Sequence, residues 1–146
     1  MSQRTKSVKI ERSDLWAYGL LVVMPMIIAL GIYATLRVDP PQLVHALKGW
    51  GGQTVFLIPD HFDWLIYNAP DGLWAFSMTS FLMLTSKKDS RLQRTCYLTI
   101  GIIVMLGLEL LQGTMLAGTF DVKDAIWILV GFIFSVFVTS QPLRAR

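Results

Sequence analysis

The sequence predicts an all-α membrane protein, a bundle of about four transmembrane helices with both termini in the cytoplasm. Of the 146 residues, 53% are hydrophobic and 16% are charged, whereas a soluble domain has about 25% charged residues. The mean hydropathy is +0.52, and the apolar residues lie in blocks. The longest block, residues 15–36, has 22 residues without a charge. A helix of that length measures about 33 Å, which is enough for a hydrocarbon core of about 30 Å.

The N-terminal basic residues and the apolar block after them superficially resemble a secretory signal. These basic residues are Arg4, Lys6, Lys9 and Arg12. The block is longer than the apolar region of such signals, about 7–15 residues, and a convincing small-residue cleavage site is lacking. We therefore expect residues 15–36 to be retained as the first span. Pro25 within it predicts a bend, which membrane helices tolerate.

Three further spans are predicted, at residues 66–86, 95–116 and 124–141. With the first span they form a single integral membrane domain over residues 1–146. The third span reaches a length of about 20 residues only if it includes Glu109 and Gln112. Ser77, Thr79 and Ser80 give the second span a mildly polar face, which predicts contacts with other helices.

Basic residues predict how the chain lies in the membrane, because short cytoplasmic loops are enriched in Lys and Arg. Ten of the 13 basic residues lie in the N-terminal tail, in the 87–94 loop and in the C-terminal tail. These three segments are therefore expected to be cytoplasmic. The 37–65 loop and the 117–123 loop then face outward, and this pattern requires an even number of spans.

The long outward loop, residues 37–65, is too apolar for a solvated linker. Residues 42–50 could form a short helix at the membrane surface, where Trp and Tyr are favoured, and a re-entrant segment is the alternative. The sequence leaves both interpretations open.

Five polar residues are predicted to gather near the outward side of the bundle and to form a binding site. They are Glu109, Gln112, Asp71, Asp121 and Asp124. A carboxylate inside a span costs several kcal/mol on insertion scales, so Glu109 should face the bundle interior, and Gln112 shares its face. The alternative for the three aspartates is helix capping. At the start of the second span, Asn68 stands at the N-cap position and Asp71 at the third position of the helix. Asp121 and Asp124 have the same spacing at the start of the fourth span.

Other chemistries find little support in the sequence. Cys96 is the single cysteine, so an internal disulfide is excluded. His45, His61 and the acidic residues beside His61 lack a recognised metal spacing. Basic residues flank the apolar blocks, which disfavours nucleic acid as a partner. We expect no metal and no cofactor, and we favour binding over catalysis, because the acidic residues are not accompanied by a nucleophile with a neighbouring His.

Three short motifs follow one another within residues 64–135. They are PDGLWAFS at 70–77, ELLQ at 109–112 and GTFDVKD at 118–124. In order, spacing and side of the membrane they resemble the motifs of the VanZ-like family of small membrane proteins. The resemblance implies a bundle of about four helices whose polar positions meet near the outer face. It assigns the family's Glu and Gln to Glu109 and Gln112, and its acidic positions to Asp71 and Asp124.

The chain differs from this family at several positions. Ala75 and Ile128 stand where the family often has His and Asn, and the Arg that often precedes the last span is lacking. A catalytic or transport role that needed those groups does not carry over to this chain.

These observations predict a protein of the bacterial inner membrane, with a polar pocket in the outer leaflet. The pocket would bind or handle a cell-envelope lipid, a lipid-linked precursor or an amphiphilic antibiotic. The alternative is a small accessory subunit of a larger membrane complex, with a membrane protein or a second copy as its partner. A third hypothesis is an enzyme acting on a lipid-linked substrate, with Glu109 and Asp124 as acid and base.

Overall fold

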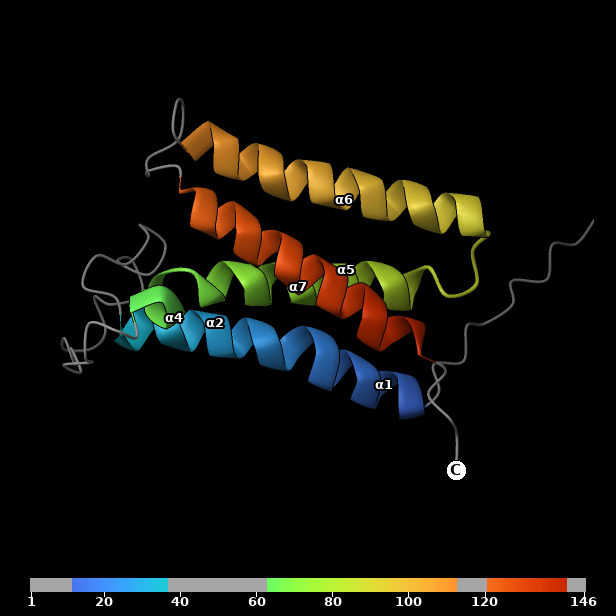
Figure 1. Cartoon of the computed structure of the whole chain (residues 1–146). Helices are drawn as coiled ribbons and strands as arrows, with labels where there is room; N and C mark the ends of the chain where they lie inside the picture. The colour runs from blue at the N-terminus through green and yellow to red at the C-terminus, as the bar shows by residue number, and fades with distance from the viewer. Residues whose placement is uncertain (1–11, 37–62, 113–120, 142–146) are drawn as a thin grey trace, which may run out of the picture.

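The computed structural model describes residues 12–36, 63–112 and 121–141, and every regular element in these ranges is a helix (Figure 1). In chain order the elements are α1 (Arg12–Tyr18), the π-helix η1 (Gly19–Val23), α2 (Met24–Thr35), α4 (Asp63–Tyr67), α5 (Ala69–Thr85), α6 (Arg91–Gln112) and α7 (Val122–Ser140). The predictions for residues 42–50, His45 and His61 lie outside the described residues.

Three of the described helices are long and apolar enough to cross a membrane. They cover Asp14–Thr35, Arg91–Gln112 and Val122–Ser140, with mean hydropathies of 2.2, 1.7 and 1.9. The first and last agree with the predicted spans to within two residues at each end, and the middle one begins four residues earlier than predicted. The all-helical class is therefore confirmed for the described residues, and three of their helices have the length and composition of membrane spans.

The predicted span at 66–86 corresponds to the shorter helix α5. Its 17 residues measure about 26 Å, less than a hydrocarbon core of about 30 Å. Helix α4 precedes it, with Asn68 between the two. The Asn68 N–H donates to the Trp64 carbonyl at 3.0 Å, and the Asn68 carbonyl accepts from Gly72 at 3.4 Å, so helical hydrogen bonding continues past the junction.

Pro25 is accommodated by the π-helix that ends two residues before it. A proline lacks a backbone N–H, and its ring crowds the carbonyl one turn earlier, so a regular α-helix would be strained here. The Ser77 hydroxyl of α5 donates to the Val22 carbonyl in η1 at 2.6 Å. A side chain from another helix thus stabilises the irregular backbone before Pro25, as is common in membrane helices.

Helix α5 is the centre of the bundle and packs against α2, η1, α6 and α7. Its buried residues are mostly small, which lets the neighbouring backbones approach closely. Helix α7 crosses α5 (Figure 1), and their backbones come so close that a Cβ on Gly131 would collide with the Gly72 carbonyl oxygen, so only glycine fits there. The Ser80 and Ser135 hydroxyls share a hydrogen bond of 2.8 Å further along the same interface. The predicted helix contacts of the second span are thus confirmed for Ser77 and Ser80.

Helix α6 packs less tightly than α5. Of its residues, all of which the structure describes, only Gly101 and Glu109 are buried. A Cβ on Gly101 would come within 2.7 Å of the Leu82 Cδ1 atom of α5, so these helices are close at that level. Glu109 lies about two turns further along α6, and between the two levels the wall of the bundle is open enough to hold a cavity.

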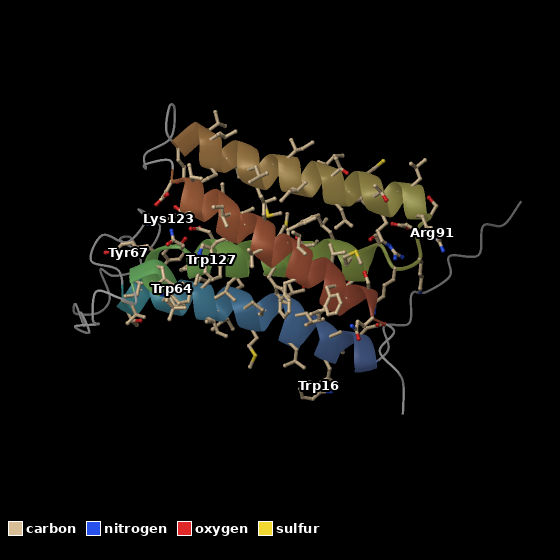
Figure 2. All side chains as sticks on the ribbon, viewed as in Figure 1. Trp16, Trp64, Tyr67, Arg91, Lys123 and Trp127 are labelled. Carbon is tan, nitrogen blue, oxygen red and sulfur yellow. The ribbon has the colours of Figure 1, made fainter. Side chains whose placement is uncertain are left out.

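The two ends of the bundle differ in charge. At one end, here called the Lys87 end, lie Lys87, Lys88, Arg91 and Arg94. The Arg94 guanidinium donates to the carbonyls of Ser86 and Lys87 at 3.2 and 3.0 Å and so caps the end of α5. At the opposite end, here called the Asp71 end, lie Asp71, Glu109, Asp121 and Asp124. Figure 2 labels Arg91 at the first end and Lys123, Trp64 and Trp127 at the second.

Candidate functional site

A cavity of about 390 Å³ lies at the Asp71 end of the bundle, where α2, α5, α6 and α7 meet. Its polar lining consists of Tyr33, Asp71, Glu109 and Gln112. The remaining lining is apolar or small: Leu30, Trp74, Ala75, Met78, Val104, Met105, Leu108 and Ile128. Three of the five predicted site residues therefore line one cavity.

Asp71 is positioned by the start of α5 and by a contact with α2. Pro70 is buried in the first turn of α5, where its missing N–H costs nothing. The Tyr33 hydroxyl donates to Asp71 Oδ1 at 2.8 Å, across 38 residues of sequence. One partner of this carboxylate is thus a phenol on another helix.

Asn68 does not act as the predicted N-cap of α5. Its backbone is helical, with φ −108° and ψ −32°, and its side chain makes no capping hydrogen bond. The Asn68 amide instead donates to Asp124 Oδ1 on α7 at 2.6 Å. The capping prediction was wrong here because a partner on a neighbouring helix lies within reach of the side chain, and sequence spacing cannot show such a partner.

Asp121 and Asp124 hold α7 in place beside the cavity. Asp121 is extended and accepts the Lys123 N–H at 2.9 Å, so it is the predicted N-cap of α7. Asp124 lies in the first turn, where a negative charge also interacts favourably with the helix dipole. Neither residue belongs to the lining of the cavity. The structure therefore assigns both of them to helix ends and to contacts between helices.

Glu109 is the most deeply buried acidic side chain of the described residues, with 4% of its surface exposed. It faces the bundle interior, as predicted. Its Oε1 accepts the backbone N–H of Asp121 at 3.5 Å, a long contact that joins the end of α6 to the start of α7. Gln112, one turn further on, is half-buried and lines the cavity on the same side.

The rim of the cavity faces the surroundings of the bundle between α5 and α6. Trp74 and Met78 of α5 are each 43% exposed, and Val104 and Leu108 of α6 are each 50% exposed. These four side chains line the cavity and also reach the outer surface, which in a membrane is covered by lipid. The polar side chains of the cavity thus lie toward the Asp71 end of the bundle, and its exposed apolar side chains lie on α5 and α6.

Sequence reasoning missed two contacts of the site, that of Tyr33 with Asp71 and that of Asn68 with Asp124. Tyr33 is a hydroxyl-bearing residue near the end of the first apolar block, which is a signal that could have placed it beside Asp71. Asn68 was identified in the sequence, but as the N-cap of its own helix. In the part of the chain that the structure describes, no group of three or more His, Cys, Asp or Glu side chains could hold a metal ion.

Comparison of the chain with protein-family models, with curated proteins and with solved structures gives no match. The resemblance to the VanZ-like family stays a prediction that rests on the three motifs. Two positions at which the chain differs from that family, Ala75 and Ile128, both line the cavity. Their side chains make this wall apolar, which suits the binding of a hydrocarbon group.

Proposed function

We propose that this chain is a four-span, VanZ-like protein of the bacterial inner membrane, and that its cavity binds an amphiphile from the outer leaflet. The candidate ligands are a cell-envelope lipid, a lipid-linked precursor and an amphiphilic antibiotic. The observation that carries the proposal is the combination in one cavity of a polar end, which includes the buried Glu109, with an apolar rim of exposed side chains on α5 and α6.

The fourth span of this proposal is formed by α4 and α5 together. Residues 63–85 with Asn68 between the helices would measure about 35 Å, and their backbone hydrogen bonds run across the junction. The orientation follows from charge. The short segment between α5 and α6 carries Lys87 and Lys88, and α6 begins with Arg91, so the Lys87 end is assigned to the cytoplasm. The cavity then lies in the outer half of the membrane.

Aromatic residues support this placement. Trp64 and Trp127 stack at the Asp71 end, with ring centroids 5.4 Å apart, and Trp16 projects from the bundle at the opposite end (Figure 2). Trp and Tyr side chains are enriched at both membrane–water interfaces, because one part of the ring system is apolar and the other can hydrogen-bond. The two ends of the bundle are thus compatible with the two surfaces of a bilayer.

The volume of the cavity favours binding of part of a lipid. Ligand sites have volumes of about 300–1,000 Å³, and 390 Å³ is near the lower limit. It accommodates a head group and the first part of a chain, while the rest of the chain remains in the bilayer. Entry through the rim between α5 and α6 needs no passage through water.

The experiment that tests this proposal is purification of the full chain in nanodiscs made from its native membrane, followed by mass spectrometry of the bound lipids and proteins. Val104→Trp would fill the entrance of the cavity, and Ile103→Trp is the matched control, because Ile103 is 63% exposed and does not line the cavity. We expect a particular lipid to be retained by the wild type and by the control but lost from Val104→Trp.

Two results would overturn the proposal. Retention of the same lipids by Val104→Trp would show that they do not occupy the cavity. A stoichiometric protein partner, with no lipid that depends on Val104, would favour the accessory-subunit hypothesis and would make the polar end of the cavity a contact within a complex.

A further inference from the structure

The Lys87 end of the bundle carries a surplus of positive charge. Its described side chains include four bases and two acids: Lys87, Lys88, Arg91, Arg94, Asp14 and Asp89. Two of the bases already have partners. The Lys87 ammonium forms an ion pair with Asp14 at 3.2 Å, and the Arg94 guanidinium donates to the two carbonyls at the end of α5.

The other two bases, Lys88 and Arg91, have no such partner. Both side chains are exposed, and neither makes a hydrogen bond or an ion pair with another described residue. Asp89 lies between them in sequence, and it forms no ion pair with either. Arg91 lies at the extreme end of the bundle (Figure 2). An ammonium and a guanidinium, three residues apart, are therefore available to an anion from outside.

The backbone at the start of α6 contributes little to this attraction, because it is already capped. The Ser90 N–H donates to Gln93 Oε1 at 3.1 Å, and the Gln93 N–H donates to Ser90 Oγ at 3.3 Å. This reciprocal pair is a capping box. An anion at this end is thus attracted by the side chains of Lys88 and Arg91.

An exposed apolar ridge continues from Arg91 along α6. Leu92, Cys96 and Ile100 follow one another at intervals of four residues, which places them on one side of the helix. Leu92 is 74% exposed and Ile100 is 60% exposed, and Cys96 is exposed as well. The ridge measures about 12 Å, which is most of one leaflet, half of a hydrocarbon core of about 30 Å.

We infer that the Lys87 end binds an anionic phospholipid, with its phosphate at Lys88 and Arg91 and an acyl chain along the ridge of Leu92, Cys96 and Ile100. The apolar ridge beside the two cations favours a lipid over a soluble anion. A guanidinium can hold two phosphate oxygens at once, and a lysine side chain extends its ammonium to the head-group level. None of these five residues lines the cavity, so the inference goes beyond the proposed function and concerns the opposite end of the bundle.

The test uses the full chain in nanodiscs and three lipid probes with identical acyl chains. Phosphatidylglycerol and phosphatidylethanol are both anionic, and only the first carries free hydroxyl groups, while phosphatidylcholine is zwitterionic. Binding is measured by native mass spectrometry as the ratio of bound lipids at equal concentration. We expect both anionic lipids to be preferred over phosphatidylcholine, by a factor of about five for each of the two basic side chains.

Single substitutions assign the preference to its residues. Lys88→Gln and Arg91→Gln should each lower it about fivefold, whereas Arg91→Lys keeps the charge and should retain most of it. Lys123→Gln is the matched control, because Lys123 is an exposed lysine at the other end of the bundle, between Asp121 and Asp124. It should leave the preference unchanged. Thermal denaturation of each variant verifies the fold.

The same measurements are repeated with Val104→Trp, so that a lipid in the cavity does not contribute to the ratio. Equal binding of the three lipids, or a preference that persists in both Lys88→Gln and Arg91→Gln, would overturn the inference. Selection of phosphatidylglycerol over phosphatidylethanol would replace charge by hydroxyl recognition. Displacement of the lipid by excess inorganic phosphate would assign the site to soluble anions. These outcomes do not depend on whether Val104→Trp releases a lipid, so the proposed function stands or falls separately.

Discussion

The contact between Gly72 and Gly131 makes the α5–α7 interface sensitive to a single methyl group. In Gly131→Ala, the new Cβ would overlap the Gly72 carbonyl oxygen and lie within 3.1 Å of the Gly72 Cα atom. A backbone carbonyl cannot rotate away as a side chain can, so the helices must separate. Overpacking of this kind costs about 1–3 kcal/mol, and we take the upper half of that range.

Two smaller effects enter the expected change in the free energy of unfolding. Separation of the helices weakens the Ser80–Ser135 hydrogen bond at the same interface, which contributes about 0.6 kcal/mol in membrane proteins. Alanine also favours the helix over glycine by about 0.8–1.0 kcal/mol. The sum is a net loss of about 2 kcal/mol.

The assay is equilibrium unfolding in mixed micelles of dodecyl maltoside and sodium dodecyl sulfate, followed by circular dichroism. Gly107→Ala is the matched control, because nothing lies within 4 Å of a Cβ built at Gly107 in α6. We expect the control to be as stable as the wild type or slightly more stable. If Gly131→Ala unfolded at the same detergent ratio as Gly107→Ala, the argument that backbone contact fixes the α5–α7 distance would be refuted.

Three further predictions concern the interface, the cavity and the orientation in the membrane. Ser80→Ala and Ser135→Ala, combined in a double-mutant cycle, should give a coupling energy of about 0.6 kcal/mol for their 2.8 Å hydrogen bond; strictly additive effects would contradict it. Tyr33→Phe should cost about 1 kcal/mol of unfolding free energy in the same assay, because the carboxylate at the start of α5 loses a donor; unchanged stability would argue against that bond. In a background without the native cysteine, a membrane-impermeant maleimide applied to intact cells should label Lys123→Cys and spare Lys88→Cys. The opposite labelling would reverse the assigned orientation.

The helical class and the positions of the three long apolar helices were predictable because the signal is local. A helix rises about 1.5 Å per residue, so an uncharged run of 22 residues fixes a span with little reference to the rest of the chain. The same reasoning did not show that α5 is the central helix. Its buried face carries Gly72, Ser77 and Ser80, and the importance of these small residues comes from the helices that pack on them.

The sequence indicated three polar residues that line the cavity, Asp71, Glu109 and Gln112, but not their contacts. Glu109 was expected to face inward because of the cost of a charge in lipid, and its exposed fraction of 4% agrees with that expectation. The partner of Asp71 lies 38 residues away in sequence, and the partner of Asn68 lies 56 residues away. Such pairs depend on how the helices pack, which neither hydropathy nor local spacing reveals.

The position of the cavity follows from the difference between two helix interfaces. Helix α5 is joined firmly to α7 by three contacts. These are the backbone contact of Gly72 with Gly131, the Ser80–Ser135 hydrogen bond and the Phe76–Phe134 ring contact, with centroids 5.7 Å apart. In contrast, α6 meets the bundle at Gly101 and again at Glu109, and the cavity rim lies between these levels. The cavity therefore lies on the side of α5 where the contacts between helices are fewest, and the entry route of the proposed function uses this looser interface.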